Sequence, residues 1–197
     1  MMCFEHEDVT YVHAPKIGSR SILGWLAILK NPKLYEDHPE YFKEINVGDA
    51  VYKGIRSRVD ATNSITTPIA FCVTRDPIKR FVSNYKNRVL THQKVKPTPT
   101  LSEFMDNFDD LFDKNTDIRN HFPTLTHFYG PDRSVYQKVF RTENLDECRV
   151  FLQEHFKCEL PSLRLQQSKK VKEPQLTDQQ VSWIKDKYSE DYVNGWI

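Results

Sequence analysis

The stretch VTYVHAPKIGSRS, residues 9–21, decides the fold that this sequence predicts. Its first six residues, 9–14, are rich in β-formers and are followed by a proline, which is typical of a short buried strand. Lys16 and Gly18 then form a tight turn, and from Ser21 onward apolar residues recur at helical spacing. A strand that turns directly into a helix aims several backbone N–H groups at one point, which makes an anion-binding site.

A second strand-to-helix corner follows later in the chain. The unbroken apolar run IAFCV at 69–73 suits a central parallel strand, and Pro77 suits the first position of a helix. Arg75 leaves the carboxyl end of that strand, where open α/β sheets bind ligands, and Ser83 lies further along the helix. A guanidinium and a hydroxyl placed in this way suit a phosphate monoester. We expect Arg80 to be a helix-surface or orienting residue.

The rest of the chain continues the alternation of strands and helices. Further strands are expected at 51–59 and 135–140, and helices at 101–112, 145–156 and 177–188. We therefore predict an α/β fold, with a single domain over residues 1–197. Its central, mainly parallel sheet should be flanked by helices in a P-loop-like nucleotide fold.

The composition excludes several classes of protein. Lys and Arg number 28 and Asp and Glu 27, and this net charge of +1 does not suit a protein that coats a nucleic acid. The four cysteines have no CxxC spacing, which argues against a zinc site and a disulfide framework. No run approaches the roughly 18 apolar residues that span a bilayer, and the first residues do not resemble a signal peptide. We expect a cytoplasmic protein with no metal, membrane or nucleic-acid partner.

The first corner has phosphate-binding chemistry without the Walker A sequence. Gly18 permits close approach of a ligand, Lys16 adds a positive charge, and Ser19 and Ser21 can donate hydroxyl hydrogen bonds. A Walker A loop reads GxxxxGK[ST], whereas here the lysine precedes the glycine and no metal-binding pair is evident. Taken alone, these residues also fit an ordinary turn with a surface lysine.

Together the two corners, PKxGSxS and RDPxxRxxSxY, resemble the sulfotransferase superfamily, and most closely its carbohydrate, Golgi-type branch. The likeness continues in NHFP at 120–123, in FRTENL at 140–145 and in the C-terminal residues 167–192. In order, these segments span nearly the whole chain, and the first two motifs are specific in combination. The resemblance implies a central parallel sheet and a sulfuryl donor, 3′-phosphoadenosine 5′-phosphosulfate (PAPS).

The resemblance also implies roles for particular residues. Arg75 and Ser83 would hold the 3′-phosphate of the donor, and Lys169 or Lys170 would close over the nucleotide. We expect neither the anchor nor the stem that is usual in the family, so a Golgi location is not carried over. Arg20 stands where the family commonly has threonine, so a cation replaces a hydroxyl. The loop that would hold the 5′-phosphosulfate consists of Pro15, Lys16, Ile17, Gly18, Ser19, Arg20 and Ser21.

The expected reaction is in-line transfer of a sulfuryl group to an acceptor hydroxyl or amine, with no metal required. Lys16 would stabilise charge on the leaving 5′-phosphate. Three residues remain open as the general base: His121 first, then His13, and Glu143. The acceptor would be a glycan or small metabolite, and the sequence fixes neither its identity nor the oligomeric state. The other histidines are expected at the surface or in packing: His6, His38, His92, His127 and His155.

Two other functions fit part of the pattern. A P-loop phosphotransferase that uses ATP accounts for the first corner, but leaves the early lysine and the pairing of Arg75 with Ser83 unexplained. A non-catalytic nucleotide-binding module accounts for both corners and needs no base. The sulfotransferase interpretation requires the strand ends near residues 14 and 74 to lie side by side.

Overall fold

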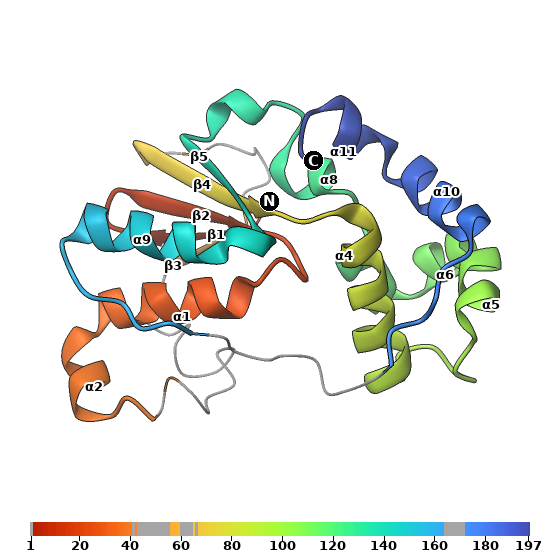
Figure 1. The fold of residues 1–197 in the computed structure, drawn as a ribbon, viewed down its shortest axis with the longest axis horizontal. Coiled ribbons are helices and arrows are strands. Elements are labelled where there is room, and N and C mark those ends of the chain that lie inside the picture. The colour runs from red at the N-terminus through yellow and green to blue at the C-terminus, as the bar shows by residue number, and fades with distance from the viewer. Residues whose placement is uncertain (1, 41, 43–55, 60–64, 66, 164–171) are drawn as a thin grey trace.

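A five-stranded sheet in the order β3-β1-β2-β4-β5 forms the centre of the molecule (Figure 1). The computed structural model describes residues 2–40, 42, 56–59, 65, 67–163 and 172–197. The strands β2, β4 and β5 pair in parallel, whereas β1 runs antiparallel to both β2 and β3. The predicted α/β fold with a mainly parallel sheet is therefore confirmed. The strands are Met2–His6 (β1), Val9–His13 (β2), Arg56–Val59 (β3), Ile69–Thr74 (β4) and Lys138–Arg141 (β5).

Helices cover the sheet and extend beyond one end of it. The helices α1 (Ser19–Lys30) and α9 (Leu145–Phe156) lie along one face, and α8 (Leu125–Tyr129) packs against β2. Short α2 (Pro32–Asp37) follows α1, and α11 (Ser189–Val193) contacts α8. The 3-10 turns η2 (Arg133–Val135) and η3 (Thr142–Asn144) flank β5.

A second group of helices lies beyond the carboxyl end of β4, at the right of Figure 1. In α4 the side chain of Asp76 accepts from the Lys79 backbone N–H, and Pro77 takes the first helical position. The π-helix η1 continues α4 without a break. The members of the group are α4 (Pro77–Asn84), η1 (Tyr85–Thr91), α5 (Leu101–Asp106), α6 (Phe108–Lys114), α7 (Thr116–His121) and α10 (Asp178–Lys187).

Each of the two parts has its own hydrophobic core. In the sheet part, the fully buried ring of Phe71 stacks on Tyr11 and meets the edges of other aromatic rings from β5 and α9. In the helical part, the buried ring of Phe81 contacts Phe122 and Tyr188 among other aromatic residues. The β2–α1 loop therefore lies where two separately packed bodies meet.

The structure differs from the predicted elements in several places, and the short helices α2, α7, α8 and α11 were not predicted. Strand β1 was not predicted, the expected helix 101–112 is interrupted at Asn107, and the strand expected at 135–140 begins only at Lys138. The asparagine side chain donates to the Glu103 carbonyl, which offers the backbone an alternative to a continuous helix. Residues 51–55 of the expected strand 51–59 lie outside the described part of the chain.

Candidate functional site

The first corner is a tight turn with two residues in left-handed conformation. Lys16 has φ 66° and Gly18 has φ 83°, and helix α1 begins directly afterwards at Ser19. The Ser19 hydroxyl donates to the Ala14 carbonyl at 2.8 Å, which closes the turn. A Cβ added at Gly18 would lie 2.9 Å from Leu145 Cδ2, so both the φ angle and the space favour glycine. A lysine in left-handed conformation is uncommon, and such residues cluster at ligand sites.

The second corner lies directly beside the first. Strands β2 and β4 are parallel neighbours, with Val12 paired to Cys72, so their carboxyl ends emerge together. The Arg75 guanidinium reaches across, and its Nη1 donates to the Lys16 carbonyl at 2.9 Å. The side-by-side placement that the sequence interpretation requires is therefore present. The Asp76 side chain caps helix α4 by accepting from the Lys79 backbone N–H, and the Asp76 carbonyl accepts from the Arg80 backbone N–H at 2.9 Å.

Arg80 joins the loop to the helical part of the molecule. Its side chain is fully buried, and Nε donates to the Pro15 carbonyl at 3.1 Å. Nη1 donates to the Pro123 carbonyl at 2.7 Å, and Nη2 lies 3.5 Å from the His121 carbonyl. The rings of Phe128 and Tyr188 lie 5.3 and 5.9 Å from the guanidinium carbon. Of the two expected roles, Arg80 thus has the orienting one and does not lie on the helix surface.

A cavity of about 270 Å³ opens between the β2–α1 loop, the π-helix η1 and the end of α7. Among the described residues that line it none is acidic, so an anion entering it meets cationic and neutral groups. His92, which was expected at the surface or in packing, is exposed and lies at this cavity. The lining consists of His13, Pro15, Lys16, Gly18, Ser19, Arg20, Asn87, Arg88, His92 and His121.

The electrostatics of the cavity show its positive character. Burial, reinforced by the charges of Arg75, Arg20 and Arg88, lowers the pKa of Lys16 to about 8. Burial and the neighbouring His121 and Arg80 lower the pKa of His13 to about 4. Cations that destabilise one another in this way would gain stability from a bound polyanion.

The imidazole of His121 has a defined orientation. Its Nδ1 lies 2.7 Å from the Asp117 carbonyl oxygen, which can only accept, so Nδ1 carries the proton of the neutral ring. Nε2 is thereby left with a lone pair. The His121 carbonyl accepts from Asn84 Nδ2 at 2.7 Å, which fixes the backbone as well. Burial is the main cause that lowers the pKa of His121, and the charge of Arg88 adds to it.

Several predicted site residues do not line this cavity. Ile17 is fully buried in the sheet core and Ser21 is 4% exposed. The exposed hydrogen-bond donors of the turn therefore belong to the residues next to these two. Arg75 lies behind the loop, and Ser83 is a half-buried residue of α4. Lys169 and Lys170 lie outside the described residues.

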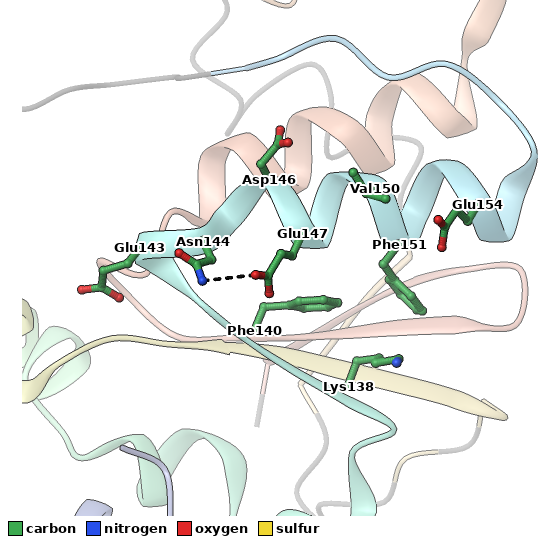
Figure 2. A pocket seen from close by; sticks show the side chains of 9 residues that line it. All are labelled: Lys138, Phe140, Glu143, Asn144, Asp146, Glu147, Val150, Phe151 and Glu154. Carbon is green, nitrogen blue, oxygen red and sulfur yellow. Dashed lines mark hydrogen bonds between the residues drawn. The ribbon is translucent and has the colours of Figure 1, made fainter.

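A larger cavity of about 620 Å³ lies between β5 and α9 (Figure 2). Phe140 and Phe151 lie between the strand and the helix, and Glu147 accepts from Asn144 at 3.1 Å. Glu143 lines this cavity and pairs with Lys79 at 3.2 Å, so the structure separates it from His13 and His121. With four carboxylates and one lysine in its lining, this cavity is electrostatically unsuited to a polyanion.

Sequence reasoning missed several residues of the site, among them Arg88 and Asp117. Arg88 Nε donates to Asp117 Oδ1 at 2.6 Å, and Arg88 Nη2 contacts Asp117 Oδ2. The pair joins η1 to α7 across 29 residues of chain, and no local motif marks it. π-helices are frequent at functional sites. The helical apolar pattern of α4 continues through η1, so the sequence does not distinguish this π-helix from an α-helix.

A family model described as "Sulfotransferase family" matches residues 1–194 of the 197. The chain belongs to the sulfotransferase family. The family is that of the carbohydrate, Golgi-type sulfotransferases, so the resemblance seen in the two corners is confirmed. Membership implies an enzyme that transfers a sulfuryl group with PAPS as donor. No curated protein and no solved structure gives a significant match to this sulfotransferase.

Two further observations concern membranes and metals. Within the described ranges of this sulfotransferase, no helix has the length and apolar character needed to cross a bilayer. Among the same residues, no group of three or more His, Cys, Asp and Glu side chains is placed to hold a metal ion. The cytoplasmic location and the metal-free reaction both stay predictions.

Proposed function

We propose that this sulfotransferase moves a sulfuryl group from PAPS to a hydroxyl or amine of a carbohydrate or small-metabolite acceptor, in the cavity of about 270 Å³ beside the β2–α1 loop. One observation carries the proposal: Lys16, Arg20 and Arg88 line the same cavity, and among the described residues no carboxylate lines it with them. A donor with several negative charges is stabilised by such a set of groups. We propose that one domain, residues 1–197, performs the reaction.

The loop at the start of α1 fits the phosphosulfate end of the donor. The first N–H groups of a helix have no partner within the helix, and the helix dipole adds partial positive charge there. When bound, PAPS supplies an electrophilic sulfuryl group on a phosphate leaving group. Lys16 would stabilise the charge that develops on this phosphate. In the proposed assignment, the loop Pro15, Lys16, Ile17, Gly18, Ser19, Arg20 and Ser21 binds this end of the donor.

Arg75 and Ser83 would bind the 3′-phosphate. Arg75 uses one N–H on the Lys16 carbonyl, and a guanidinium has further donors that can form a fork with a phosphate. Lys169 and Lys170 remain proposed contacts from the C-terminal side.

His121 is the proposed general base. Its proton on Nδ1 leaves the Nε2 lone pair to take a proton from the acceptor, and it lines the same cavity as Lys16. His13 is a weaker base because its pKa is lowered to about 4. Glu143 already pairs with Lys79 and lines the other cavity.

The donor site is tested by calorimetry with adenosine 3′,5′-bisphosphate, AMP and ATP. We expect tighter binding of the bisphosphate than of AMP, and loss of this preference in Arg75→Ala. Arg149→Ala, which removes an arginine paired with Asp146 on α9, is the matched control and should keep the preference. Equal affinities for AMP and the bisphosphate in the wild type would contradict the assignment of Arg75. Preference for ATP would favour the phosphotransferase.

Catalysis is tested by transfer of labelled sulfate from PAPS to a panel of sugars and small metabolites. Lys16→Ala should reduce kcat about 10²–10³-fold, as the loss of a group that stabilises transition-state charge does. His121→Asn should reduce it about 10²–10⁴-fold. Tight bisphosphate binding with no transfer to any acceptor would favour the non-catalytic module.

A further inference from the structure

A carboxylate lies directly behind the proposed base. Asp117 Oδ1 lies 3.7 Å from His121 Nδ1, and the carbonyl of the same residue lies 2.7 Å from that nitrogen. Both oxygens of the Asp117 carboxylate also contact Arg88, through Nε and Nη2. The side chains of Arg88, Asp117 and His121 are 16%, 22% and 27% exposed, so solvent screens these charges only partly.

Among the described residues, the other titratable groups that face His121 are cations or imidazoles. The groups that face it are His13 from β2, Lys16 from the loop, Arg20 from the start of α1, Arg88 from η1 and His92 directly after η1. In the described part of the chain, Asp117 is the acidic residue in contact with the imidazole. An imidazolium that forms there is repelled by the cations and attracted by this one carboxylate.

The position of Asp117 is fixed from several sides. Asn115 Oδ1 accepts from the backbone N–H of Asp117 at 3.0 Å and of Ile118 at 3.2 Å, which caps helix α7. Asn115 Nδ2 in turn donates to the Lys94 carbonyl at 2.8 Å. The two-point contact with Arg88 fixes the carboxylate itself, because the planar guanidinium fork defines an orientation as well as a distance.

We propose that Asp117 is a positioning residue for the base: fixed by Arg88, its carboxylate stabilises the His121 imidazolium that forms during transfer. The inference rests on the proposed sulfuryl-transfer function. In the step concerned, the acceptor proton moves to His121 Nε2 while the acceptor oxygen bonds to sulfur. The bond between sulfur and the 5′-phosphate oxygen breaks, and its electron pair stays on that oxygen, beside Lys16.

The first test is independent of activity and follows the imidazole protons by NMR during a pH titration. In Asp117→Asn the midpoint of His121 should move to lower pH, because a negative charge next to the ring is lost and the charge of Arg88 is no longer balanced. Asp117→Glu, which keeps the charge, should stay closer to the wild type.

The pair of Asp8 and His155, at 2.9 Å, provides a matched control far from the cavity. Asp8→Asn should leave the titration of His121 unchanged. An unmoved His121 midpoint in Asp117→Asn would overturn the inference.

The second test measures sulfate transfer. Asp117→Asn should lower kcat about tenfold, move the acid limb of the pH profile to lower pH, and change the KM for PAPS less than twofold. In a His121→Asn background, the same substitution should have no further effect on kcat, because the base through which it acts is gone. Additive losses would overturn the inference, and so would a full kcat with an unshifted acid limb.

The proposed function and the inference about Asp117 can be refuted independently of each other. If the wild type transfers no sulfate from PAPS to any acceptor, the proposed function is wrong, whereas a shifted His121 titration still supports the positioning by Asp117. If the wild type transfers sulfate and Asp117→Asn alters neither the titration nor the pH profile, only the inference about Asp117 is wrong. Melting curves of Asp117→Asn and Asp117→Glu identify a loss of activity that comes from unfolding.

Discussion

Replacing Arg80 by leucine tests whether one buried side chain connects the two parts of the molecule. Arg80 donates to the Pro15 carbonyl at 3.1 Å and to the Pro123 carbonyl at 2.7 Å; its third contact, 3.5 Å from the His121 carbonyl, is at the limit for a hydrogen bond. The two shorter bonds come from a charged donor and contribute about 1.5 kcal/mol each at the lower end of the usual range. Leucine offers no replacement for these donors, so we expect a loss of about 3 kcal/mol in the free energy of unfolding.

For a chain of this length, such a loss lowers Tm by about 6–12 °C. Urea denaturation followed by tryptophan fluorescence is suitable, because Trp25 packs in the sheet core and Trp183 against the helical core. Arg133→Leu is the matched control: this arginine is exposed and donates one bond, to the Gly195 carbonyl at 2.7 Å. The control should lose less than about 1 kcal/mol. An Arg80→Leu protein that unfolds within about 1 kcal/mol of the wild type would refute the reasoning.

Three further predictions concern the β2–α1 loop and the reaction. Gly18→Ala should lower the free energy of unfolding by about 1–3 kcal/mol and weaken binding of adenosine 3′,5′-bisphosphate. The reason is that the new Cβ would contact Leu145 and that the φ angle is left-handed. Unchanged melting and binding would contradict this. Since the pKa of Lys16 is lowered to about 8, kcat/KM should fall as pH rises above about 8 and the lysine loses its charge. Lys16→Arg should move that fall to higher pH, and an identical profile would exclude Lys16 as its cause. Finally, sulfate transfer should survive EDTA; a strict requirement for a divalent ion would contradict the proposed metal-free mechanism.

The sequence predicts both corners because each depends on a local signal. An apolar strand, then Gly18 or Pro77 at a position suited to its backbone, then a helical apolar stripe can all be recognised within a dozen or so residues. Parallel pairing of β2 with β4 follows from the strand–helix alternation and brings Arg75 to Lys16. The fold and the side-by-side placement of the two corners could therefore be predicted from the sequence.

Strand β1 was missed because its hairpin has no recognisable turn. The two residues between β1 and β2 are Glu7 and Asp8, and Glu7 has φ 52°. Two-residue hairpin turns of this kind usually contain Asn-Gly or Asp-Gly, which adopt positive φ at low cost. Nothing in Glu-Asp indicates a turn, so the first residues gave no sign of a strand.

The contacts of His121 were missed for a different reason. Arg88 and Asp117 come from elements that are far apart in the sequence, and their pairing depends on how α7 packs against η1. Arg80 was correctly proposed as a possible orienting residue, but its three carbonyl partners come from two distant segments. Such long-range polar contacts leave no periodic trace in the sequence.

The cavity lies between two separately packed cores, so the two parts of the molecule supply different groups to the proposed reaction. The β2–α1 loop assigned to the phosphosulfate end of the donor belongs to the sheet side, whereas Ser83, Arg88 and His121 belong to the helical side. Substitutions in the helical part can therefore change the side of the cavity that contacts the acceptor. The β2–α1 loop, which binds the nucleotide, would keep its geometry. Such modularity would let one ancestral scaffold acquire new acceptors by changing only one of its halves.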